Sequence, residues 1–346
     1  MRRILALLLS VSLLTACAPI EEPVILEHQA GGAILSIPLE SDEQTEPPAP
    51  AVPVLNPSPA RVQPPPALYS GGVYMYNTET DTVVFAKNEH VKYPPASIAK
   101  IMTLLVVMDN TDDLNSPVEV TREAFADFDN GDPNFDGAAI AGIEVGQTNL
   151  SYLDCLYALM LPSGCEAANI LAYNAGGRSI PSFIDMMNEK ALELGCLNTN
   201  FTNASGLYEE NFYTTAYDMF LITKYTLDKY PMFREIYEKP FHQMPANKAY
   251  PEPYPARNVN QGLRILHDMD FAVGIKIGSI YEYFHGGVRL DGFMTLASIA
   301  EKNGLTFIII SLDADYYNEE GKWSGYHYED HAVLYEWAYK TFEKSG

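Results

Sequence analysis

The stretch Tyr93-Pro-Pro-Ala-Ser-Ile-Ala-Lys-Ile-Met-Thr103 places a serine at the start of an apolar run and a lysine three residues later. Prolines just ahead of such a run predict a helix that begins near the serine. Residues three apart share one helix face, so Ser97 and Lys100 are expected within hydrogen-bonding reach. A lysine whose pKa is lowered by burial and a neighbouring cation can take the serine proton. Alone the pattern is weak, because an N-cap serine followed by a solvated lysine has the same spacing.

Two further short signals follow in order along the chain. Ser163-Gly-Cys165 comes first, and Lys276-Ile-Gly278 with Ser279 directly after it comes second. Three ordered signals are much rarer by chance than one, so the significance of Ser97 and Lys100 depends on the other two.

The spacing of apolar residues predicts the elements around these signals. Residues 72–76 and 82–85 flank Asn77-Thr-Glu-Thr-Asp81 and predict a β-hairpin. Helices are predicted at residues 98–108, 152–161, 167–174, 182–194, 216–228 and 329–342, and strands at residues 271–277, 288–299 and 305–312. This order predicts one α/β domain in which both chain ends build an antiparallel sheet beside a helical lobe.

The motifs and their surroundings resemble the serine D-alanyl-D-alanine carboxypeptidases, the low-molecular-mass penicillin-binding proteins. The resemblance rests on residues 93–103, on Leu159-Met-Leu-Pro-Ser-Gly-Cys-Glu-Ala-Ala168, on Val273-Gly-Ile-Lys-Ile-Gly278, and on Asn203-Ala-Ser-Gly-Leu207 with Tyr213-Thr-Thr-Ala-Tyr-Asp218. It implies a β-lactamase/transpeptidase-like α/β fold. It also implies hydrolysis of a terminal D-Ala-D-Ala bond in peptidoglycan stem peptides, covalent inhibition by β-lactams, and no cofactor or metal.

The resemblance assigns three catalytic residues and an oxyanion hole. Ser97 is expected to attack the substrate carbonyl, Lys100 to act as the base, and Ser163 to relay a proton to the leaving amine. The backbone N–H groups of Ser97 and Ser279 are expected to stabilise the oxyanion. Water would then hydrolyse the acyl-enzyme.

Substrate binding is assigned to Lys276, Ile277, Gly278, Ser279 and Cys165. Lys276 is expected to face the cleft, bind the substrate carboxylate and keep the site electropositive. Two positions depart from the family pattern, since Cys165 stands where an asparagine is usual and Ile277 where a threonine is usual. A thiol is a weak donor and acceptor, and Ser279, two positions after Ile277, could supply the missing hydroxyl. Each lost contact would cost about 1–3 kcal/mol.

These departures leave alternatives to the carboxypeptidase. One is a degenerate homologue that binds cell-wall peptides with little or no turnover, and another is a β-lactamase. Glu166-Ala-Ala-Asn169 has the composition of a deacylating glutamate motif but directly follows the second signal, where that motif is not expected. Cys165 as a nucleophile is disfavoured, because no histidine lies near it in sequence and a small buried hydrophobe is the more common role.

The N-terminal part predicts export. Residues 1–17 combine a basic start, a short apolar run and Leu14-Thr-Ala-Cys17, which resembles a lipobox in which Cys17 is lipidated. Residues 18–67 form a predicted acidic tether containing 12 of the chain's 24 prolines. Residues 68–346 form the predicted catalytic domain. The protein is therefore expected to be lipid-anchored to the bacterial cell envelope on its extracytoplasmic side.

The net charge and cysteine count bound the remaining partners. A formal net charge of -23 disfavours nucleic acid and anionic lipid surfaces. With Cys17 lipidated, Cys155, Cys165 and Cys196 are an odd set, so at least one free thiol is expected and pairing of Cys155 with Cys196 stays open. The acidic stretch at residues 127–137 partly matches a calcium loop but lacks its final ligand position, which favours a solvated loop.

Overall fold

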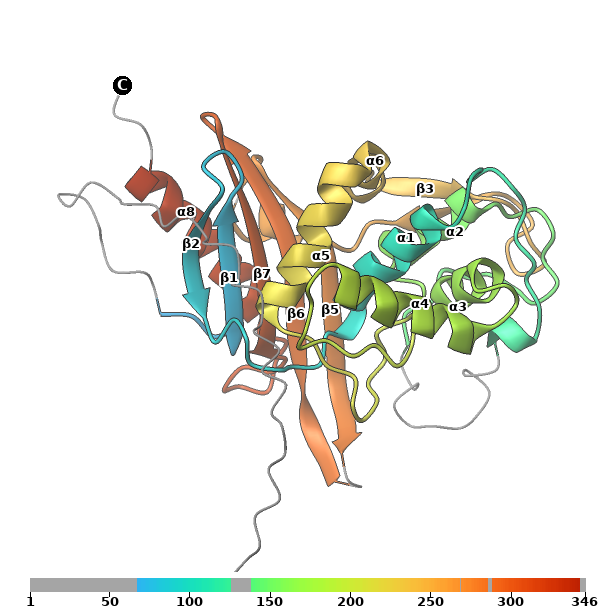
Figure 1. Ribbon diagram of the computed structural model, residues 1–346, viewed down its shortest axis with the longest axis horizontal. Coiled ribbons are helices and arrows are strands. Elements are labelled where there is room, and N and C mark those ends of the chain that lie inside the picture. Colours follow the sequence, from blue (N-terminus) through green and yellow to red (C-terminus); the bar gives the residue numbers. More distant parts are fainter. Residues whose placement is uncertain (1–66, 126–137, 268, 286–287, 343–346) are drawn as a thin grey trace, which may run out of the picture. The chain divides into compact units, whose positions relative to one another are not determined.

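The sheet is built from both ends of the described chain. The computed structural model describes residues 67–125, 138–267, 269–285 and 288–342 (Figure 1). Five antiparallel strands are arranged in the order β2-β1-β7-β6-β5. Their bounds are β1 Gly72–Asn77, β2 Thr82–Lys87, β5 Ala272–His285, β6 Val288–Lys302 and β7 Leu305–Asp315. The predicted hairpin and the predicted joining of both chain ends in one sheet are therefore confirmed.

Helices cover both faces of this sheet. The C-terminal helix α8, Tyr326–Phe342, lies on one face of the sheet (Figure 1). It packs there with α7, Gly262–His267, through a cluster that includes Phe307 of β7 and Tyr335 of α8. His331 of α8 bonds to two buried serine hydroxyls, Ser298 of β6 at 2.6 Å and Ser311 of β7 at 2.8 Å. Buried polar groups are thus satisfied between α8 and the sheet.

The other face supports the helical lobe, which lies between the hairpin and the C-terminal strands in sequence. Its helices are α1 Lys100–Asp109, α2 Tyr152–Met160, α3 Cys165–Ala175, α4 Ile180–Glu193, α5 Ala216–Lys229 and α6 Pro231–Glu238. Ser151 and Asp154 form a capping box at the start of α2, which satisfies two backbone donors. Helix α1 is almost completely buried among its neighbours, so its first turn is held rigidly.

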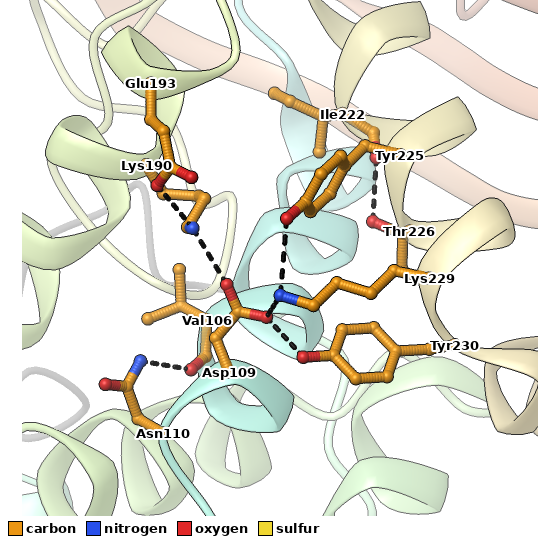
Figure 2. A network of polar contacts seen from close by, with 10 residues as sticks. All are labelled: Val106, Asp109, Asn110, Lys190, Glu193, Ile222, Tyr225, Thr226, Lys229 and Tyr230. Carbon is orange, nitrogen blue, oxygen red and sulfur yellow. Dashed lines mark hydrogen bonds and ion pairs between the residues drawn. The ribbon is translucent and has the colours of Figure 1, made fainter.

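An ionic network fixes the other end of α1. Asp109 accepts from Lys190 of α4 at 2.9 Å and from Lys229 of α5 at 2.8 Å, and also from the Tyr230 hydroxyl. Figure 2 shows the carboxylate between the two ammonium groups, with Glu193 paired to Lys190. Three helices therefore meet at one side chain.

Several elements were not predicted from the sequence. These are the 3-10 helix η1 Ala96–Ala99, α6, α7, and the small hairpin of β3 Phe241–Met244 and β4 Tyr254–Arg257. Strand β5 was predicted to end at residue 277 but continues to His285, because β6 pairs with it along its whole length.

Three smaller expectations concern thiols, metals and the N-terminal segment. Cys155, Cys165 and Cys196 are all buried and free, so Cys155 and Cys196 do not pair. Within the described ranges, His, Cys, Asp and Glu side chains form no group of three that could hold a metal ion. The signal with Cys17, the tether and the acidic stretch at 127–137 lie outside the described residues. Among the described helices, none has the length and apolar character needed to cross a bilayer.

Candidate active site

Ser97 lies in the 3-10 turn η1 that leads into α1. Pro95 precedes the turn, and Ala96 adopts a φ of 48°, a left-handed conformation that is uncommon for a non-glycine residue. Side chains at positions i and i+3 eclipse in a 3-10 turn. Lys100 Nζ accordingly lies 3.0 Å from Ser97 Oγ. The structure therefore brings together the first two predicted site residues, with a turn tighter than the α-helix expected.

The Lys100 ammonium is fully buried and has three hydrogen-bond partners. Besides Ser97 Oγ, it donates to the Ser205 carbonyl and to Cys165 Sγ, the latter at 3.5 Å. Burial lowers the pKa of Lys100, while Cys165 and Glu166 partly oppose this shift. A lysine whose pKa is lowered in this way loses its proton at a lower pH than a solvated lysine does. Its neutral amine can then act as a base.

The Ser205 carbonyl is aimed by a turn whose role sequence reasoning did not assign. Asn203 Oδ1 accepts from the backbone N–H of Ser205 at 3.2 Å and of Gly206 at 2.8 Å. Gly206 has a φ of 82°, and a Cβ there would lie 2.9 Å from Ser97 Cα. The Asn203-Ala-Ser-Gly206 stretch therefore packs directly under η1, which explains why asparagine and glycine occur at these positions.

The second signal connects α2 to α3. Ser163 adopts a left-handed φ of 66°, and Cys165 is the first residue of α3. The Cys165 N–H donates to the Ala139 carbonyl at 2.8 Å, so the second signal is joined to the segment after residue 137. A serine held in a sparsely populated backbone conformation is a feature found at functional sites.

The third signal lies on β5, at the edge of the sheet next to η1. A bulge between Gly274 and Lys276 precedes it, and bulges re-aim the side chains that follow. A Cβ at Gly278 would lie 2.8 Å from Ser97 N and closer still to Thr295 Oγ1. Gly278 therefore permits the close approach of β5 to the Ser97 backbone.

Asn260 holds this part of β5 and was missed by sequence reasoning. Its Oδ1 accepts from the Ile277 N–H at 2.9 Å, and its Nδ2 donates to the Met160 carbonyl at 2.8 Å. The side chain is fully buried. It links the third signal to the end of α2, just before Ser163. A lone asparagine in a loop carries no signal that could have predicted this link.

Lys276 does not occupy the place predicted for it on the cleft surface. The side chain is fully buried, and its ammonium donates to the neighbouring Ile277 carbonyl at 2.6 Å. Burial, followed by the charge of Lys100, lowers the pKa of Lys276 well below its usual value. In this arrangement Lys276 lies beneath the cleft surface, close enough to Lys100 and Cys165 for their charges to act on it.

A cleft of about 200 Å³ opens beside these residues. Its lining contains Ser97, Ser163, Cys165, Ile277 and Ser279, together with Ala138, Ala139, Gly206, Leu207 and residues 280–282 of β5. Lys100 and Lys276 lie beneath this surface and not on it. The cleft thus presents a serine hydroxyl whose neighbouring amine is shielded from solvent, an arrangement suited to nucleophilic acyl transfer.

The sequence profile of the D-alanyl-D-alanine carboxypeptidase family matches residues 59–270, more than half of the 346 residues. The chain belongs to this family. The match includes Ser97, Lys100 and Ser163 and ends before Lys276, so the third signal lies beyond the matched part.

Curated D-alanyl-D-alanine carboxypeptidases give the same result. The chain is 33% identical over 150 residues to the enzyme DacF of Bacillus subtilis, covering 42% of this chain and 36% of that protein. It is 34% identical over 167 residues to the Streptomyces K15 enzyme, covering 46% of this chain and 55% of that protein. The aligned part thus spans about half the length of these relatives, or less.

Solved structures confirm the predicted fold class. The Streptomyces K15 DD-transpeptidase structure matches with a TM-score of 0.65 at 24% identity, covering 80% of this chain and 99% of that chain. The carboxypeptidase family fold, with an antiparallel sheet and a helical lobe, is therefore the fold of this protein.

Proposed function

We propose that this protein is a serine-type D-Ala-D-Ala carboxypeptidase that acts on peptidoglycan stem peptides through an acyl-enzyme. The observation that carries the proposal is the 3.0 Å contact between Lys100 Nζ and Ser97 Oγ at the cleft, with the lysine fully buried. Membership of the D-alanyl-D-alanine carboxypeptidase family supports the choice of substrate class.

In the proposed reaction, neutral Lys100 accepts the Ser97 proton while Ser97 Oγ bonds to the substrate carbonyl carbon. The backbone N–H groups of Ser97 and Ser279 would bind the oxyanion. When the carbon–nitrogen bond breaks, the proton passes from Lys100 through the Ser163 hydroxyl to the leaving D-alanine. Water, deprotonated by Lys100, then cleaves the ester and restores Ser97.

The substrate-binding roles change in one respect. Because the Lys276 ammonium is covered, we assign it an electrostatic effect on Lys100 in preference to direct contact with a carboxylate. Two ammonium groups in one dry region disfavour each other's charged form, which helps to keep the base neutral. The Ser279 hydroxyl at the cleft is then the candidate donor for the substrate carboxylate.

We also propose that the protein is lipid-anchored through Cys17 and acts outside the cytoplasm, with β-lactams as covalent inhibitors. This part rests on the lipobox-like Leu14-Thr-Ala-Cys17 and the proline-rich residues 18–67. A tether of this composition would hold the catalytic domain away from the membrane. Metabolic labelling with a palmitate analogue tests it, since Cys17→Ala should abolish the label.

Two assays on the full-length chain test the main proposal. One is covalent labelling with a fluorescent penicillin, and the other is release of D-alanine from a D-Ala-D-Ala peptide. Both signals should be lost in Ser97→Ala and kept in Ser182→Ala, which alters an exposed serine on α4. A wild-type protein that releases no D-alanine and takes up no label would overturn the proposal.

A second candidate is a degenerate homologue that binds wall peptides without efficient turnover. It is favoured by Cys165, a weak acceptor at 3.5 Å from Lys100, and by Ile277. Solved variants of the Streptomyces K15 DD-transpeptidase alter a serine and, two positions later, a cysteine, the spacing of Ser163 and Cys165. A large gain in acylation in the Cys165→Asn/Ile277→Thr variant would indicate a weakened site, whereas no change would count against this candidate.

The β-lactamase alternative gains no support from Glu166. Its carboxylate is 2% exposed and bonded to the backbone of residues 141–143, so it does not present a base to water in the cleft. Rapid penicillin hydrolysis in place of a long-lived adduct would favour that alternative.

A further inference from the structure

Glu166 is a buried carboxylate beside the site that the reaction above does not use. Its Oε1 accepts from three consecutive backbone N–H groups, those of Ala141 at 2.5 Å, Gly142 at 2.9 Å and Ile143 at 3.3 Å. Its Oε2 is buried and has no hydrogen-bond partner among the described residues. Burial raises the pKa of Glu166 above its usual value, and the three N–H donors on Oε1 offset part of that rise because they favour the charged form.

The segment held by Glu166 forms one wall of the cleft. Ala138 and Ala139 line the cleft, and the Ala139 carbonyl accepts from the Cys165 N–H at 2.8 Å. On its other side, the Gly142 carbonyl accepts from Asn247 Nδ2 at 2.8 Å. Glu166 supplies the side-chain contact from α3, so losing it would free the N–H groups of residues 141–143 and loosen the wall.

We infer that Glu166 is a positioning residue for the acylation of Ser97. Its carboxylate fixes the cleft wall at residues 138–143 and places a buried negative charge next to Cys165, the neighbour of Lys100. This assignment rests on the function proposed above and adds a residue to it. Glu166 acts through the wall and through Lys100, and it does not line the cleft.

The charge of Glu166 acts within a small group of titratable side chains. Lys100 is affected by Cys165 and Glu166 of α3, and its own charge acts on Lys276 of β5. Burial raises the pKa values of Cys155 of α2 and Tyr254 of β4, and the nearby Glu166 adds to both shifts. Since Glu166 opposes the lowering of the Lys100 pKa, neutralising it should lower that pKa further.

Glu166→Gln separates charge from shape, because an amide oxygen can still accept from the three N–H groups. The pH dependence of fluorescent-penicillin acylation should shift to lower pH, so that on the acidic limb, where Glu166 of the wild type is still ionised, the variant retains about threefold more of its plateau rate than the wild type. Glu166→Asp, which keeps the charge, should retain the wild-type pH profile. A purely structural carboxylate would leave the profiles of wild type and Glu166→Gln identical.

Two measurements on the full-length chain do not depend on activity. Hydrogen exchange at Ala141 and Gly142 should be about tenfold or more faster in Glu166→Ala than in wild type. The Lys100 titration, followed by NMR of 13C-labelled lysine and assigned with Lys100→Arg, should move to lower pH in Glu166→Gln.

Asp218→Asn is the matched control, because Asp218 is a buried carboxylate in the first turn of α5 that accepts from the Asn198 N–H at 2.9 Å. It should change neither exchange at residues 141–142 nor the Lys100 titration. An unmoved Lys100 titration in Glu166→Gln, or unchanged exchange in Glu166→Ala, overturns the assignment. A wild type that is never acylated refutes the proposed function, while these two measurements still decide the role of Glu166.

Discussion

At Gly278 the chain has room for a hydrogen atom and nothing larger. A Cβ would meet Ser97 N, in the η1 turn, at 2.8 Å, and the buried Thr295 Oγ1, on β6, at a shorter distance. We predict that Gly278→Ala pushes β5 away from η1 and displaces the proposed oxyanion donors. A displacement of about 1 Å can reduce the rate about a hundredfold. Stopped-flow acylation with a fluorescent penicillin measures this loss.

Gly146 provides the control for that substitution. It also requires a special backbone, with a φ of 82°, but a Cβ there would have no atom within 4 Å. Gly146→Ala should therefore lower stability by about 1 kcal/mol and leave acylation unchanged. Equal acylation rates in wild type and Gly278→Ala would show that the close approach is unimportant for the reaction.

The residues of the site differed in how far the sequence could predict them. The contact between Ser97 and Lys100 was predictable because the two residues are three positions apart within one turn, so it depends on local backbone geometry alone. The contacts of Lys100 with Ser205 and of Ile277 with Asn260 join segments far apart in sequence, so spacing contains no information about them. The burial of Lys276 was not predictable either, since strand alternation indicates which face a side chain points to but not how completely other segments cover it.

At the level of elements, the Asp109 network makes three helices depend on one carboxylate. Asp109→Ala would leave Lys190, whose side chain is 15% exposed, and Lys229 without their shared partner. We predict a loss of about 2–4 kcal/mol in the free energy of unfolding, because Lys190 keeps only Glu193 while Lys229 and the Tyr230 hydroxyl lose their hydrogen bonds to Asp109. Urea unfolding followed by circular dichroism measures the loss.

The pair of Lys224 and Asp228 on α5 is the control for this prediction. It is an i,i+4 ion pair at 2.7 Å in which Asp228 is 64% exposed. Asp228→Ala should cost less than about 0.5 kcal/mol, since exposed pairs of this kind contribute little. If Asp109→Ala and Asp228→Ala lowered the free energy of unfolding by similar amounts, Asp109 would contribute no more than an exposed ion-pair partner, which would contradict the prediction.

Element prediction succeeded where the local pattern was decisive. The capping box at Ser151 and the left-handed Gly195 after α4 mark helix ends through local geometry, and both helices were predicted near their observed bounds. The pairing of β3 with β4 depends on distant partners across a loop, and its strands of four residues are too short for a periodic signal.

For the described domain as a whole, the joining of the chain ends follows from simple rules. A hairpin at the start and strands at the end each expose one hydrophobic face, and placing β1 beside β7 buries both. The strand order itself was not specified by any single segment. It depends on contacts such as those of His331 with Ser298 and Ser311, which link α8 to two strands.

The same interface makes the stability of the folded domain sensitive to acid through His327, which is fully buried with both ring nitrogens lacking a partner among the described residues. Burial lowers its pKa from 6.5 to about 3. Between these pH values the unfolded chain binds a proton that the folded chain does not bind. The free energy of unfolding therefore falls as the pH decreases from 6.5 toward 3, by up to about 3–5 kcal/mol from this group.

His327→Phe should therefore match or exceed wild-type stability at pH 7.5, and its advantage should grow at pH 4.5. Urea unfolding at both pH values measures this difference, with the exposed His90→Gln as control. A His327→Phe difference that does not change with pH would contradict the prediction, because the buried imidazole of His327 would then contribute no pH-dependent stability.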